Sequence, residues 1–273
     1  MSGAAGGGAF VAGATGYVGR ELVRQLAGGG VPTVAHVRPD SPRLAEWRAR
    51  FEAFGAAVDA TPWDEEAMTA TLAALRPATV FALLGTTRAR GRAAARRGGG
   101  AESYETVDYA LTMRLVRAAA AAARAGGTAP RVVYLSAIGA RADARNPYVA
   151  VRGRVERELG ASGLPFTIVR PSFVTGPDRE ESRPAERLGA RVLDALLAIP
   201  GALGARRLRD RWRSTTAAEL AAALARVAAD PDAAGRVLHG EALRAAGADA
   251  STGAARTPPA PTAFPPRARP PRP

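Results

Sequence analysis

The sequence predicts an α/β fold built on a doubly wound parallel sheet. Two observations support this fold class. Between Ala9 and Val169, short apolar runs alternate with helical patterns, a rhythm typical of βαβ units. A glycine-rich turn directly follows the first apolar run, as in the Rossmann arrangement of such sheets.

The strands are expected at six apolar runs: Ala9 to Ala12, Thr33 to Val37, Ala56 to Val58, Val80 to Leu84, Val132 to Leu135 and Phe166 to Val169. Three helix starts are indicated by capping residues. Ser41 and Thr61 are each followed by proline, and Thr216 is followed three residues later by Glu219, which predicts a capping box.

The chain is expected to have three parts. Residues 1–176 form the Rossmann domain, and residues 177–246 form a small helical segment that covers the substrate and ends in a returning strand. A helix is predicted at Glu186 to Ile199, where leucine and valine recur at helical spacing. Residues 247–273 are rich in proline, arginine and alanine, a composition that predicts a disordered tail.

The charge of the chain does not by itself indicate a nucleic-acid partner. The formal net charge is +13, but all 38 basic residues are arginine and lysine is missing, so the charge follows a bias of the whole chain. Nucleic-acid binding is therefore expected to be unlikely. With no cysteine and two histidines, thiol and zinc chemistry are also not expected.

No apolar run is long enough to cross a bilayer, and the first eight residues show no basic segment leading into an apolar one. We therefore expect no membrane span and a cytoplasmic location. The sequence leaves open a homodimer.

The turn after the first strand has the form expected of a dinucleotide cradle. Glycines recur in the spacing GxxGxxG. The first would permit a tight turn, the second a close approach of the backbone to the pyrophosphate, and the third close packing of helix on strand. The residues expected to bind the cofactor here are Gly13, Ala14, Thr15, Gly16, Tyr17, Val18 and Gly19.

The end of the second strand favours NADP(H) over NAD(H). No acidic residue stands there to bind the ribose 2′-hydroxyl, and Arg38 follows Val37 directly. A guanidinium suits a 2′-phosphate. Asp59, at the end of the third strand, is a further candidate for contact with the adenine.

The candidate chemistry lies in Ser136, Tyr148 and Arg152. Ser136 closes the fifth strand, and Tyr148 opens a helix behind Asn146 and Pro147. Arg152 follows Tyr148 by four residues, so both side chains lie on one helical face and could meet one ligand.

This set, with the glycine spacing, the segment Leu84 to Arg88, the pair Arg170-Pro171 and the run Asp178 to Pro184, resembles the atypical short-chain dehydrogenases and reductases. The resemblance is to the group of Tat-interacting oxidoreductase-like proteins. It implies that Ser136 orients a carbonyl, that Tyr148 supplies a proton, and that Arg152 replaces a lysine that holds the nicotinamide ribose. It also implies cofactor contacts from Leu84, Gly85, Thr86, Tyr148, Arg152, Pro171 and Phe173.

The resulting hypothesis is an NADP(H)-dependent oxidoreductase that acts on a small carbonyl or alcohol substrate. Two alternatives remain: a protein that binds NADP(H) and regulates a partner, and a nucleotide-sugar epimerase or dehydratase. A serine hydrolase is disfavoured because the sequence has no Gly-x-Ser-x-Gly motif.

Overall fold

The computed structural model describes residues 7–86, 103–171, 215–239 and 243. Within these residues, a sheet of seven parallel strands has the order β3-β2-β1-β4-β5-β6-β7. The strands are β1 (Ala9–Ala12), β2 (Thr33–His36), β3 (Ala57–Asp59), β4 (Thr79–Ala82), β5 (Arg131–Leu135), β6 (Phe166–Arg170) and β7 (Arg236–His239). The α/β Rossmann fold predicted from the sequence is confirmed.

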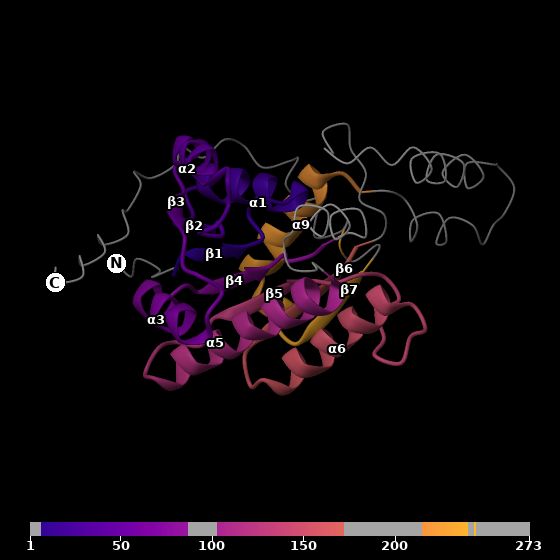
Figure 1. Cartoon of the computed structure of the whole chain (residues 1–273). Helices are drawn as coiled ribbons and strands as arrows, with labels where there is room; N and C mark the ends of the chain where they lie inside the picture. Colours follow the sequence, from indigo (N-terminus) through magenta and orange to yellow (C-terminus); the bar gives the residue numbers. More distant parts are fainter. Residues whose placement is uncertain (1–6, 87–102, 172–214, 240–242, 244–273) are drawn as a thin grey trace, which may run out of the picture.

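Helices cover both faces of the sheet (Figure 1). One face carries α1 (Tyr17–Gly28), α2 (Leu44–Ala53) and α9 (Ala217–Ala229). The other carries α3 (Glu65–Leu75), α5 (Thr112–Arg124) and α6 (Pro147–Ala161). Because both faces are covered, the central strands are continuous apolar runs rather than alternating ones, and all four residues of β1 are buried.

The helices bury their apolar sides in two cores, one on each face of the sheet. Leu22 of α1, Phe51 of α2 and Leu224 of α9 belong to the first core. Met68 of α3 and Leu159 of α6 belong to the second. Since α9 packs on α1 and β7 pairs with β6, residues 217–239 extend the same three-layered body.

The order of the strands fixes the place of a ligand site. Chain progression runs from β1 through β2 to β3 in one direction and from β4 through β5 to β6 in the other. The loops that follow β1 and β4 therefore diverge at the carboxyl edge of the sheet. In open parallel sheets, this switch point is where ligands bind.

Two helix starts differ from the sequence prediction, and one agrees. Helix α2 begins at Leu44 with Arg43 as its N-cap, not at Ser41, and α3 begins at Glu65 behind an Asp64 cap, not at Thr61. Asp64 accepts a hydrogen bond from the Ala67 N–H, so its carboxylate, and not the hydroxyl of Thr61, caps α3. The capping box of Thr216 and Glu219 at the start of α9 is confirmed.

Before α5, the chain forms a π-helix, η1 (Tyr104–Leu111), and a short 3₁₀ turn, η2 (Pro231–Ala233), precedes β7. Several sequence predictions lie outside the described residues: Phe173, the helix at residues 186–199, most of the substrate-covering segment, and the tail at residues 247–273.

Candidate functional site

The loop between β1 and α1 has the shape of a phosphate cradle. Gly13 has a positive φ of 85°, and a Cβ there would lie 2.6 Å from the carbonyl oxygen of Leu83. A Cβ on Gly19 would lie 2.2 Å from the carbonyl oxygen of Gly13. Both positions therefore require glycine, for the separate reasons that the sequence predicted: a left-handed turn and close packing of helix on strand.

The start of α1 is open to an anion. Gly16 is its N-cap, no side chain caps the first turn, and that turn has no acidic residue. The amide groups and the positive end of the helix dipole therefore face outward from the cradle without a competing carboxylate. This arrangement fits the pyrophosphate of NAD(P)H, with Ala14, Thr15, Tyr17 and Val18 completing the loop and the first turn.

Beyond the end of β2 the chain carries a cation, Arg38, and the strand itself has no acidic residue. Val37 is buried and Arg38 is exposed, with its Nε 3.8 Å from a carboxylate oxygen of Asp40. His36 is buried, and its Nε2–H donates to the carbonyl oxygen of Thr61 at 2.8 Å. Arg38 is thus the charged group that this strand end offers to a ribose or its phosphate.

The structure places Asp59 in a turn. Its Oδ2 accepts a hydrogen bond from the Thr61 N–H at 3.0 Å, and its Oδ1 accepts one from the Thr61 hydroxyl at 2.9 Å. The side chain is 4% exposed. Asp59 therefore shapes the chain after β3, and its contact with the adenine stays a prediction.

Tyr148 lies at the first turn of α6, where Asn146 caps the helix. The phenol is half-buried, and its ring centroid is 5.2 Å from that of Tyr104 in η1. The Cζ atom of Arg152 lies 5.2 Å from the same ring. As the sequence predicted, tyrosine and guanidinium are neighbours on one helical face.

The guanidinium of Arg152 is bound to the protein on both of its Nη atoms. Nη1 donates to the carbonyl oxygen of Leu135 at 2.7 Å, and Nη2 donates to that of Leu84 at 3.0 Å. Nη2 also forms a 2.5 Å ion pair with Asp108, which is fully buried in η1. Nε–H is buried and has no acceptor among the described residues. Counting the longer contact with the Tyr134 hydroxyl at 3.3 Å, the two Nη atoms of Arg152 have four acceptors, and all four are protein atoms.

The charge states around this pair follow from burial and contact. Burial raises the pKa of Asp108, and the guanidinium of Arg152 and the Thr86 N–H oppose that rise. Burial opposes the charge on Arg152, but Tyr134, Tyr148 and Asp108 outweigh it and raise its pKa, so it stays a cation. Burial also raises the pKa of Tyr134 to about 12, so this second phenol stays protonated at neutral pH.

The hydroxyl of Ser136 also has a charged partner. It donates to Oε1 of Glu156 at 2.5 Å, and the same carboxylate forms an ion pair with Arg170. Arg170 Nε donates to Glu156 at 2.9 Å, and its Nη2 donates to the carbonyl oxygen of Ala140. Ser136 directly follows β5 and Tyr148 lies in the first turn of α6, and each contacts a different ion pair.

Sequence reasoning missed Asp108 and Glu156. Glu156 could have been found, because it follows Tyr148 and Arg152 at a repeat of four residues and thus shares their helical face. Asp108 gives no such local signal, since its partners Thr86 and Arg152 are distant in the sequence.

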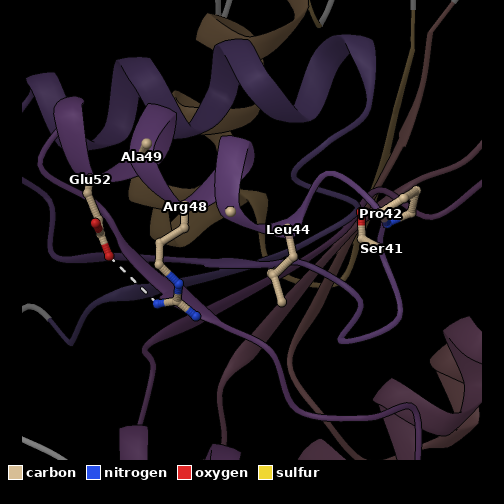
Figure 2. A pocket seen from close by; sticks show the side chains of 7 residues that line it. Ser41, Pro42, Leu44, Arg48, Ala49 and Glu52 are labelled. Atoms are coloured by element: carbon tan, nitrogen blue, oxygen red, sulfur yellow. Dashed lines mark ion pairs between the residues drawn. The ribbon is translucent and has the colours of Figure 1, made fainter.

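A separate groove of about 470 Å³ runs along α2 (Figure 2). It contains an ion pair between Arg48 and Glu52 at 3.6 Å. None of the predicted site residues lines it, so it is distinct from the cradle. Its lining residues are Ser41, Pro42, Leu44, Ala45, Arg48, Ala49 and Glu52.

The cradle, the sheet order and the open helix start together define a nucleotide-binding Rossmann protein. A model of the NAD(P)H-binding family matches residues 13–193. The chain therefore belongs to this NAD(P)H-binding family, in agreement with the resemblance to atypical short-chain dehydrogenases and reductases.

The chain is also similar to a named relative and to two solved structures. The protein named fmp52-1, mitochondrial, of Aspergillus terreus is 32% identical over 181 residues, covering 64% of this chain and 69% of that protein. MoeE5 in complex with UDP-glucuronic acid and NAD has a TM-score of 0.57 at 22% identity, covering 85% of this chain and 75% of that one. UDP-N-acetylglucosamine 4-epimerase from Bacillus cereus has a TM-score of 0.54 at 14% identity, covering 85% and 77%. At these identities, the two structures show a shared fold alone.

The prediction of a cytoplasmic location is wrong. Five relatives from Aspergillus and Emericella species, 28% to 32% identical, are named mitochondrial. The prediction depended on the absence of an apolar segment, and such an absence does not specify a compartment. Among the helices that the structure describes, none combines the length and the apolar character that a membrane crossing needs.

Proposed function

We propose that the protein is an NADP(H)-dependent oxidoreductase that acts on a carbonyl or alcohol group, with Tyr148 as the acid or base. The observation that supports this most directly is the half-buried phenol with a guanidinium 5.2 Å from its ring. The phenol and the guanidinium lie on one helical face, so both can meet the same bound substrate and cofactor, and a positioned phenol can act as a general acid or base.

In this proposal the cofactor, when bound, supplies or accepts the hydride. The loop from Gly13 to Gly19 holds the pyrophosphate, and Arg38 pairs with the 2′-phosphate. Tyr148 gives its proton to the carbonyl oxygen during reduction and takes one from the alcohol during oxidation. The buried Tyr134 is a poor proton donor, because burial raises its pKa to about 12 and so disfavours the phenolate that it would become on giving up its proton.

A specific observation favours a second candidate, a protein that binds NADP(H) and regulates a partner. The hydroxyl of Ser136 donates to Glu156, and Arg152 pairs with Asp108. Ser136 therefore has no second proton with which to orient a carbonyl, and Arg152 has an internal counter-ion. Both features lower the catalytic power expected of the set and leave cofactor binding intact.

Substitution of Tyr148 by Phe separates the two candidates. If Tyr148 is the proton donor, Tyr148→Phe should lower NADPH oxidation by roughly 100-fold with little change in NADPH affinity, since the ring stays packed. The assay is NADPH oxidation with a panel of aldehydes, ketones and quinones, and NADPH affinity by calorimetry.

Tyr109→Phe is the matched control. Tyr109 lies in η1 beside α6, and its hydroxyl donates to Glu158 at 2.8 Å. This variant should keep the turnover of the original protein. If no substrate gives turnover that depends on Tyr148, the enzyme proposal fails and the binding protein remains.

The choice of NADP(H) over NAD(H) is tested at Arg38. Arg38→Asp should weaken NADPH binding by roughly 1.5 to 3 kcal/mol, the range for a hydrogen bond to a charged group, and should affect NADH far less. Arg48→Asp makes the same change of charge on α2, in the groove outside the cradle, and controls for net charge. Equal affinity of the original protein for NADPH and NADH would contradict this part of the proposal.

A further inference from the structure

We propose that the buried pair of Arg152 and Asp108 is a clamp that fixes the backbone of residues 84–86 against the cofactor. Arg152 is then a positioning residue and not a ligand of the nicotinamide ribose, which is the role that the resemblance implies for its position. The inference rests on the cofactor binding of the proposed function and not on its turnover.

The loop that the clamp holds borders the phosphate cradle. The strands β1 and β4 are neighbours, and a Cβ on Gly13 would lie 2.6 Å from the carbonyl oxygen of Leu83 and 3.2 Å from the Leu84 nitrogen. A shift of this loop therefore reaches the cofactor site directly.

The clamp holds the loop at two backbone groups. Arg152 Nη2 donates to the carbonyl oxygen of Leu84 at 3.0 Å, and Asp108 Oδ2 accepts from the N–H of Thr86 at 2.9 Å. The two charged side chains are joined by the 2.5 Å ion pair. The backbone on both sides of Gly85 is thus fixed by a single pair of buried charges.

Gly85 allows this contact. It is exposed, and a Cβ there would lie 2.6 Å from Arg152 Nη2 and 3.4 Å from Asp108 Oδ1. Any side chain at position 85 would therefore push against the clamp.

The clamp requires a guanidinium. While Nη2 binds Leu84 and Asp108, Nη1 donates to the carbonyl oxygen of Leu135 at 2.7 Å, which ties the loop after β4 to the end of β5. The ammonium of a lysine is one compact group and cannot reach acceptors on both sides of a planar fork. Arginine at this position therefore has a function of its own here, although lysine is the residue that the resemblance implies.

The test compares two ligands that differ in the nicotinamide half. NADPH spans the whole site, and 2′,5′-ADP occupies only the adenosine half at Arg38. The double variant Arg152→Met and Asp108→Leu replaces both charges by apolar side chains and leaves no unpaired buried charge, so it is expected to fold. Calorimetry should show a loss of NADPH affinity of about tenfold or more, with the affinity for 2′,5′-ADP nearly unchanged.

Gly85→Ala tests the same clamp without removing its charges. It should lower the NADPH affinity of the original protein and have a smaller effect in the double variant, where the guanidinium is gone. Arg152→Lys should also lower the NADPH affinity of the original protein, because an ammonium cannot replace the guanidinium. As a control, Glu105→Gln with Arg154→Gln removes a 2.9 Å ion pair that joins the same elements, η1 and α6, at the surface, and this change should leave both affinities intact.

Two results would overturn the inference. One is an equal loss of affinity for NADPH and 2′,5′-ADP in the double variant. The other is an NADPH affinity that changes neither in the double variant nor in Gly85→Ala. Failure of the proposed function is a different result. A protein that binds NADPH through an intact clamp but oxidises it with no carbonyl substrate would refute the enzyme and keep the clamp.

Discussion

Substitution of Gly19 by alanine should damage both stability and cofactor binding. The new Cβ would lie 2.2 Å from the Gly13 carbonyl oxygen and 2.9 Å from the Ala14 Cα, so α1 and the cradle would have to separate by about 1.2 Å to reach an ordinary contact of 3.4 Å. Overpacking of this kind costs about 1 to 3 kcal/mol, against a gain in helix propensity of at most about 1 kcal/mol. With a propensity gain of about 0.5 to 1 kcal/mol, a net loss of stability of up to about 2.5 kcal/mol is expected.

The same helix supplies the control. Gly28 lies at the other end of α1, and a Cβ there would have no neighbour within 4 Å. Gly28→Ala should therefore stabilise the protein by about 0.5 to 1 kcal/mol and leave NADPH binding unchanged. Urea unfolding and calorimetry measure the two effects. If Gly19→Ala behaved like Gly28→Ala in both assays, the packing argument for the third glycine would be refuted.

Two further predictions concern stability. Burial lowers the pKa of His36, so below about pH 6.5 the unfolded chain binds more protons than the folded one. As the pH is lowered through this range, the free energy of unfolding should therefore fall by up to about 1.4 kcal/mol per pH unit. His36→Gln should flatten this part of the pH profile measured by urea unfolding, and an unchanged profile would contradict the assignment. Thr216→Ala removes the capping box of α9 and should cost about 1 kcal/mol, visible as a lower Tm; an unchanged Tm would show that the cap adds nothing to the packing of α9 on α1.

The fold could be predicted because its signals are local. Apolar runs that end in glycine or polar residues mark β1, β2, β4, β5 and β6, and parallel pairing follows from the helices between them. Helix starts were less predictable, because neighbouring residues compete for the role of cap. Thr61 was expected to cap α3, but its hydroxyl bonds to Asp59, and Asp64 caps the helix instead.

The candidate site was predictable only in part. The spacing from Tyr148 to Arg152 places both on one helical face, and the structure agrees. The partners of Arg152 come from three other segments, at Leu84, Asp108 and Leu135, and no local pattern connects them. A role that depends on which acceptors surround a side chain is decided by tertiary contacts, not by spacing.

The two ion pairs, Arg152 with Asp108 and Arg170 with Glu156, bear on the rate of the proposed chemistry. An unpaired lysine ammonium beside a tyrosine favours the phenolate with the field of a full charge, whereas the charge of Arg152 is opposed by Asp108 at 2.5 Å. The carboxylate of Asp108 therefore offsets part of the field that Arg152 exerts on its surroundings. The hydroxyl of Ser136 likewise donates its hydrogen bond to the carboxylate of Glu156, which already pairs with Arg170. Tyr148 must therefore transfer its proton with less electrostatic support than the resembling set implies, so slow turnover with firm cofactor binding is the behaviour that this geometry favours.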